Sequence, residues 1–106
     1  MIIKKGQTQQ IEGSNYSISL DSVVNDSRCA IEVECIWAGD AIAEFKLLSG
    51  NRFEPFELHS NQSLTNDTTI NEIKIDLLDI TPYPSTQNPI NKDNYEAKVR
   101  ITAIVM

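Results

Sequence analysis

Apolar and polar residues alternate along much of this chain, a pattern that is typical of β-strands with one buried face. The longest alternation covers residues 95–105, where every second side chain is apolar. A second one covers residues 16–20, and Val23 and Val24 then break its parity. We therefore expect two strands here, with a bulge or a strand end near Ser22 in the second.

A third apolar stripe occupies the odd positions of residues 35–47. It predicts one long strand, which ends where Ser49-Gly50-Asn51 indicates a hairpin-like reversal. Trp37 belongs to this stripe and is followed on the same face by glycine and alanine, at positions 39, 41 and 43. We expect the indole to lie over these small residues, which leave room for a large ring.

Two weaker segments predict edge strands. Pro55 removes a backbone donor from the apolar segment 53–58, which confines that strand to the edge of a sheet. Residues 7–12 contain Ile11 as their only strongly apolar anchor and indicate a further edge strand.

The second half of the chain alternates between loop and strand composition. Residues 60–69 are rich in Asn, Ser and Thr, and we interpret them as a loop that crosses the domain. Residues 70–80 resume strand character, and Leu78 and Ile80 add apolar side chains to the other face, which predicts a central strand buried on both sides near its end. Residues 81–93 hold three of the four prolines and predict a stiff, irregular loop.

No stretch favours the apolar period of a helix over period two. Roughly six or seven strands joined by turn residues indicate a sandwich or a small barrel. We therefore predict an all-β fold, an antiparallel β-sandwich of about six to eight strands and immunoglobulin-like size, formed by residues 1–106 as a single domain.

The charge balance argues against nucleic acid as a partner. The chain carries nine Lys and Arg against fifteen Asp and Glu, a net charge of −6, whereas nucleic acids and anionic membranes need clustered basic side chains. No apolar run approaches the roughly 18 residues of a membrane span. The first six residues lack the apolar core of a signal peptide, so we expect either a protein that stays where it is made or a mature form without its leader.

Cys29 and Cys35 are the only cysteines. Their spacing does not fit a C-x-x-C redox site, and a structural zinc ion needs four ligands where only His59 would add a third. We favour a disulfide that closes a short loop ahead of the expected Trp37 strand. Two unpaired thiols and a metal site that includes His59 are the alternatives.

Signatures of catalysis are missing from the sequence. His59 is the only histidine, so any Ser-His or Cys-His dyad depends on it, and a solvated position beside a polar loop is the simpler interpretation. The paired carboxylates lie on solvated strand faces, where nothing assigns them different acid–base roles. The four glycines are isolated and form no phosphate loop. We expect no enzyme, no cofactor and no metal.

The best candidates for recognition surround the cysteine loop. Asp26, Arg28 and Asp40 bracket it and form either a charged binding patch or, as we favour, an ion pair of Arg28 with a nearby carboxylate and a turn capped by Asp26. Tyr83 stands between two prolines. It is either a rigid aromatic anchor for a partner or a side chain packed over the end of the sandwich.

The block D-S-R-C-A-I-E-V-E-C-I-W-A-G-D-A, residues 26–41, resembles a pattern of small secreted or lipid-anchored bacterial proteins of unassigned function, D-S-R-C-P-x4-C-x-W-x-G-x-A. Ala30 stands where that pattern has proline. Residues 45–50, residues 77–84 and the segment from residue 93 onward are similar to further, weaker elements of the group. The resemblance covers most of residues 20–105.

This resemblance implies an extracytoplasmic β-sandwich, located in the periplasm, anchored to the outer membrane or secreted; a cytoplasmic location is the alternative. It implies no activity. The leading hypothesis is therefore a binding or accessory module of the cell envelope, without catalysis, whose partner is a protein or a small molecule. A structural self-association domain and a thiol/His metal-handling protein are the alternatives.

Overall fold

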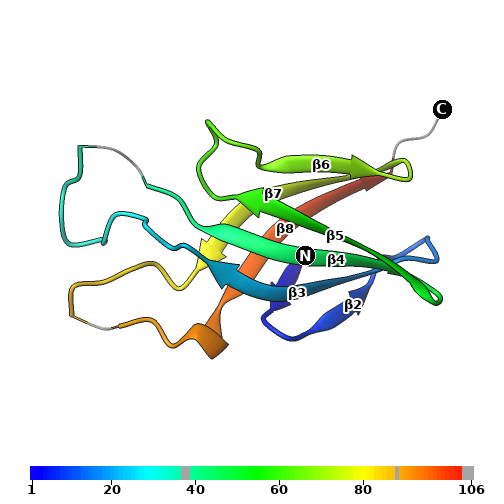
Figure 1. Cartoon of the computed structure of the whole chain (residues 1–106), viewed down its shortest axis with the longest axis horizontal. Coiled ribbons are helices and arrows are strands. Elements are labelled where there is room, and N and C mark those ends of the chain that lie inside the picture. The colour runs from blue at the N-terminus through cyan, green and yellow to red at the C-terminus, as the bar shows by residue number, and fades with distance from the viewer. Residues whose placement is uncertain (37–38, 88, 104–106) are drawn as a thin grey trace.

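Two four-stranded antiparallel sheets pack face to face (Figure 1). The computed structural model describes residues 1–36, 39–87 and 89–103. The first sheet has the order β1 (Ile2–Lys4), β8 (Glu96–Ala103), β7 (Ile73–Thr81) and β6 (Asp67–Ile70). The second has the order β2 (Thr8–Gln10), β3 (Ser17–Val24), β4 (Ile42–Ser49) and β5 (Arg52–His59). The predicted all-β sandwich is confirmed, and one short 3-10 turn, η1 (Lys92–Asn94), is the only helical element of the described residues.

The core lies between the sheets and consists of the inward-facing residues of each strand. Phe45 of β4 is buried and stacks on Phe56 of β5, with ring centroids 5.2 Å apart. Each large side chain that leaves water contributes about 1.5–3 kcal/mol to stability. The first sheet adds buried side chains from β7 and β8 to the same cluster, namely Ile75, Leu77, Ala97 and Val99.

Two bulges reset the alternation of long strands. In β3 the register shifts between Leu20 and Ser22, so the irregularity predicted near Ser22 is confirmed. In β7 the register shifts between Leu77 and Asp79. A bulge adds one residue to a strand, so the sequence positions that face the core shift by one after it.

The bulge in β7 corrects one prediction. β7 is an interior strand, as expected. Its residue Leu78, however, is exposed, while Ile80 is fully buried in the core. The expectation that this strand is buried on both sides near its end is therefore wrong. The extra residue of the bulge places Ile80 on the same buried face as Leu77, while Leu78 points outward.

The predicted edges and one predicted turn are confirmed. β4 and β5 form a hairpin in which Ser49 lies opposite Arg52. β5 is an edge strand and therefore tolerates Pro55. The other edge of this sheet is β2, which occupies the middle of the segment 7–12.

Two other boundaries were predicted wrongly. β4 begins at Ile42 and does not include residues 39–41, because Gly39 has a left-handed backbone (φ +69) and lies against Ser27. The last three residues of the expected loop 60–69 belong to β6, which pairs with β7 across a tight turn formed by two residues with positive φ, Asn71 and Glu72.

Trp37 and its expected packing over small residues lie outside the described part of the chain.

Three long connections gather at one end of the sandwich, at the left in Figure 1, which we call the loop end. They are residues 25–41, residues 60–66 and residues 82–95, the last of which matches the predicted proline-rich loop. Short turns occupy the opposite end. The fold thus brings together all the candidate recognition residues and both cysteines: Asp26, Arg28, Cys29, Cys35, Asp40 and Tyr83.

Candidate binding surface at the loop end

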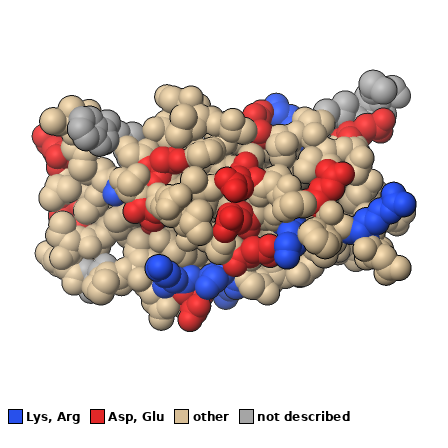
Figure 2. Space-filling model, in the orientation of Figure 1, with Lys and Arg blue, Asp and Glu red and all other residues tan. Residues whose placement is uncertain are grey.

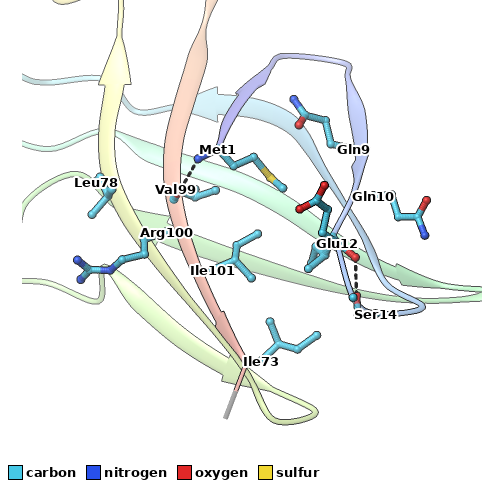
Figure 3. Close-up of a pocket in the computed structure, with 12 residues that line it drawn as sticks. Met1, Gln9, Gln10, Glu12, Ser14, Ile73, Leu78, Val99, Arg100 and Ile101 are labelled. Carbon is cyan, nitrogen blue, oxygen red and sulfur yellow. Dashed lines mark hydrogen bonds between the residues drawn. The ribbon is translucent and has the colours of Figure 1, made fainter. Parts of the chain in front are cut away.

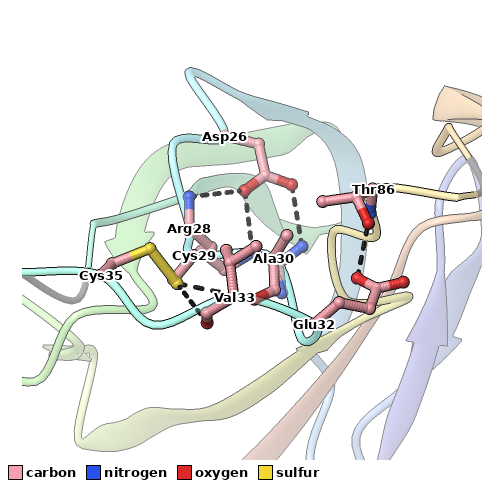
Figure 4. The surroundings of a disulfide bond; sticks show 8 residues. All are labelled: Asp26, Arg28, Cys29, Ala30, Glu32, Val33, Cys35 and Thr86. Carbon is pink, nitrogen blue, oxygen red and sulfur yellow. Dashed lines mark hydrogen bonds and ion pairs between the residues drawn. A yellow bond between two sulfur atoms is a disulfide. The ribbon is translucent and has the colours of Figure 1, made fainter.

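An ion pair anchors the first connection. The guanidinium of Arg28 contacts both carboxylate oxygens of Asp26, with Nε–Oδ1 at 2.9 Å and Nη2–Oδ2 at 2.8 Å (Figure 4). These side chains are only 10% and 12% exposed. Asp26 Oδ1 also accepts a hydrogen bond from the backbone N–H of Arg28 at 3.3 Å. The ion pair and the capped turn expected from the sequence are both present.

Arg28 also reaches the first sheet. Its Nη1 donates to the carbonyl oxygen of Ile80 at 2.5 Å, and its Nη2 donates to that of Pro82 at 3.0 Å. A planar guanidinium presents donors in several directions at once, which a lysine ammonium at the end of a flexible stem does not. Arg28 therefore fastens the connection 25–41 to the end of β7.

Tyr95 joins the same network from the start of β8. Its buried hydroxyl donates to Asp26 Oδ2 at 2.8 Å. Burial, followed by the bond to Asp26, raises the pKa of Tyr95 to about 12. Burial also raises the pKa of Asp26, but hydrogen bonds from Arg28 and Tyr95 outweigh it, so that this pKa lies below its ordinary value. We call Asp26, Arg28 and Tyr95 the Asp26 clamp.

The two cysteines form the disulfide predicted from their spacing. Their sulfur atoms lie 2.07 Å apart (Figure 4). The bond closes residues 29–35, the disulfide loop, directly after Arg28. A covalent closure of this size reduces the conformations open to the segment between the cysteines.

The disulfide loop is also bound to the connection 82–95. The carboxylate of Glu32 accepts hydrogen bonds from the hydroxyl of Ser85 and from the backbone N–H of Thr86, the latter at 3.0 Å. The N–H of Ile31 donates to the carbonyl of Pro84 at 3.0 Å. The loop is therefore held by hydrogen bonds as well as by its covalent closure.

Asp40 holds the far end of the first connection. Its Oδ2 lies 2.5 Å from His59 Nδ1, and its Oδ1 accepts from the N–H of Asn61 at 3.0 Å. Its carbonyl accepts from the N–H of Ser27 at 2.6 Å. Partial burial raises the pKa of Asp40, but the hydrogen bonds from His59 and Asn61 outweigh it and leave this pKa below its ordinary value.

Tyr83 is exposed and lies beside the Asp26 clamp. Its ring centroid is 5.8 Å from Arg28 Cζ, and its hydroxyl donates to Asp79. Tyr83 borders a groove of about 360 Å³ together with Leu78 and Cys29. The Tyr83 ring thus lies beside the guanidinium and remains 48% exposed.

Three exposed apolar side chains were not predicted as contacts. Ile31, Val33 and Ile36 are 68%, 49% and 94% exposed. Ile31 and Val33 alternate with Glu32 and Glu34, a pattern that is typical of a strand with one buried face. The cysteine spacing was the available signal, because closure of so short a ring prevents an extended strand.

The described residues of this region form neither a metal site nor a Ser-His or Cys-His dyad. Within the described ranges, no three side chains of His, Cys, Asp or Glu are placed to hold a metal ion. Cys29 and Cys35 are bonded to each other, and the His59 ring pairs with Asp40. No serine or cysteine side chain in the described part of the chain forms a hydrogen bond to that ring.

Comparison with protein-family models, curated proteins and solved structures finds no match for this chain. In residues 1–36, 39–87 and 89–103, no helix is long and apolar enough to cross a membrane. Function is therefore inferred from the loop end itself.

Proposed function

We propose that this protein is a non-catalytic binding module of the extracytoplasmic space, and that the loop end is its contact surface. The observation that carries the proposal is the exposure of Ile31, Val33 and Ile36 on a segment closed by a disulfide. Apolar side chains gathered in the open are typical of surfaces that bind another protein. Exposed apolar side chains lower the solubility of the free protein, and contact with a partner would cover them.

The rigidity of the loop end supports this role. Binding loses less free energy to ordering when the contact segment already has its bound shape. Here the disulfide, the Glu32 bonds to Ser85 and Thr86, and the Asp26 clamp hold the segment before any partner arrives.

The residues predicted as a binding patch take different roles in this proposal. Asp26, Arg28 and Asp40 direct their polar atoms into bonds within the chain and serve as the support. Tyr83 is the exposed aromatic contact next to the disulfide loop. Aromatic side chains with little rotamer freedom are frequent anchors in interfaces.

Charge indicates the chemistry of the partner. Figure 2 shows Asp and Glu side chains in several groups on the face in view, with Lys and Arg scattered between them and around the margins. Glu34 is exposed within the disulfide loop itself. A protein whose apolar patch is bordered by Lys or Arg would complement this surface.

The disulfide supports an extracytoplasmic location, because such bonds persist in oxidising compartments and are rare in the cytosol. Cells producing the protein are quenched with acid, and free thiols are alkylated before and after reduction. We expect alkylation of Cys29 and Cys35 only after reduction, read by mass spectrometry. Free thiols in the freshly quenched protein would contradict the proposed location.

Binding is tested by affinity capture from an extract of the cell envelope. We compare the wild-type protein with Ile36→Ser and with Phe53→Ser, which removes another exposed apolar side chain, from the opposite end. The captured partner should fall by about tenfold with Ile36→Ser and stay unchanged with Phe53→Ser. Equal capture by both variants, or no protein above bare resin, would contradict the proposal.

Self-association is the second candidate, and the same exposed side chains favour it. Sedimentation equilibrium should give the 11.9 kDa monomer if the partner is another protein. A dimer that dissociates on Ile36→Ser would favour self-association instead.

A further inference from the structure

Two cavities of this protein differ in how their polar groups are arranged. The first, of about 750 Å³, lies between β8 and the segment after β2, where the side chains of Arg100 and Gln10 point away from each other (Figure 3). The second, of about 630 Å³, lies at the loop end, between the end of β3 and the connection 82–95. We call it the β3 pocket. Its volume is in the range of small-molecule sites, in which apolar walls surround a few polar groups.

The walls of the β3 pocket are apolar. Val23 and Val24 come from β3, and Pro84 and Ile90 come from the connection 82–95. Val23 is 7% exposed and belongs to the core, and Ile90 packs against that core. The pocket therefore leads from the surface toward the core, so that apolar atoms of a ligand would leave water there.

The buried polar groups of the β3 pocket are Asp26 and Tyr95. Asp26 Oδ1 accepts two hydrogen bonds from Arg28, and Oδ2 accepts one from Arg28 and one from the Tyr95 hydroxyl. A carboxylate has about four positions for donors, so Asp26 has none left for a ligand. Its charge is balanced by the Arg28 guanidinium. The inner end of the pocket therefore offers no partner to an ammonium group.

Lys92 supplies a positive charge at the mouth of the β3 pocket. It is exposed, and its ammonium forms no ion pair within the described residues. The next residue, Asp93, pairs with Lys5 at 3.1 Å. Glu32, which binds the lining residue Ser85, also accepts from the N–H of Thr86. The Lys92 charge is therefore available to an anion, in a protein whose net charge is −6.

From this arrangement we infer that the β3 pocket binds a small carboxylate with an apolar body. The body lies against Val24, Pro84 and Ile90, and the carboxylate pairs with Lys92. Phosphate sites usually combine several donors, such as arginine or the N–H groups of a helix end, whereas a single ammonium matches a single carboxylate. The site goes beyond the proposed function, since the exposed side chains of the disulfide loop do not line it.

The test uses one apolar body with three head groups. Phenylpropionate, phenylpropionamide and phenylpropylamine are titrated separately into the full chain at constant pH and salt. The backbone amide signals of Val24, Asn25 and Ser85 are followed by two-dimensional NMR. We expect phenylpropionate to shift these signals with a Kd of about 1 mM. The amide should bind about fivefold more weakly, because it loses the ion pair with Lys92, and the amine should bind more weakly still.

Two lysine variants locate the charge that the ligand meets. Lys92→Gln should weaken phenylpropionate about fivefold and leave phenylpropionamide unchanged. Lys98→Gln is the matched control, because it removes the same charge from another exposed lysine that does not line the pocket. Signals from the rest of the chain verify that both variants keep the fold.

Three outcomes would overturn the proposal. The first is that none of the three amide signals shifts with phenylpropionate. The second is equal affinity for all three head groups, which would indicate apolar contact alone. The third is an equal loss of affinity in Lys92→Gln and Lys98→Gln, which would indicate a response to net charge. Each of these results leaves the capture experiment with Ile36→Ser unaffected, so the two proposals fail separately.

Discussion

The hydroxyl of Tyr95 donates a hydrogen bond of 2.8 Å to the carboxylate of Asp26, 69 positions earlier in the chain. Asp26 follows β3 in the second sheet, and Tyr95 directly precedes β8 in the first. The bond therefore ties the two sheets together at the loop end. It also gives the buried hydroxyl and the nearly buried carboxylate the partners that such groups need.

Tyr95→Phe removes this hydroxyl and keeps the buried ring. Asp26 then loses one of its donors, so we expect the free energy of unfolding to fall by about 1–2 kcal/mol, measured by urea denaturation. Tyr16→Phe is the matched control, because the Tyr16 hydroxyl forms no side-chain hydrogen bond within the described residues. Similar losses in both variants would contradict the role assigned to Tyr95.

Alkaline pH should weaken the same bond. Folding raises the pKa of Tyr95 to about 12. The contribution of the Tyr95 hydroxyl to the free energy of unfolding is therefore complete below the pKa of an unfolded tyrosine, about 10. This contribution is lost as the pH rises toward 12. We expect the difference in stability between the wild-type protein and Tyr95→Phe to shrink over this range. A difference that stays constant from pH 8 to pH 12 would contradict it.

Acid should weaken the Asp26 clamp from the other side. Folding lowers the pKa of Asp26 below its ordinary value of 3.8. The contribution of the Asp26 carboxylate to the free energy of unfolding is therefore present above pH 3.8. It is lost as the pH falls through the lower pKa of the folded state. Asp26→Asn keeps the shape and removes this titration. Urea denaturation between pH 6 and pH 2 should show a steeper acid loss for the wild-type protein than for Asp26→Asn, and parallel curves would contradict this.

Gly39→Ala tests the bend that ends the first connection. A Cβ at this position would lie 2.0 Å from the carbonyl oxygen of Ser27, at a φ of +69. We expect a loss of about 3 kcal/mol from the clash and the left-handed backbone. Gly6→Ala has a φ of +81 but meets nothing within 4 Å, so it should lose only about 1 kcal/mol. Equal losses in thermal or urea denaturation would show that backbone conformation alone matters at Gly39.

The sequence predicted which residues form the candidate site but not the contacts between them. The short cysteine spacing indicates a closed loop, and charged residues next to such a loop are the expected neighbours. The sequence did not reveal that Arg28 reaches Ile80 and Pro82, or that Glu32 binds the next connection. These contacts join connections whose proximity depends on how the two sheets are ordered and packed.

By itself, the sequence determined much of the local structure, although not the start of β4 or the presence of β6. Side chains in a strand alternate between its two faces, so the polar and apolar pattern identifies the inward residues of β3 and β8, and turn residues identify the β4–β5 hairpin. The tertiary structure alone determined which segments of the chain are neighbours in space. It placed Tyr95 against Asp26 and exposed Ile36, because these outcomes depend on packing between segments far apart in the chain, which a local pattern does not encode.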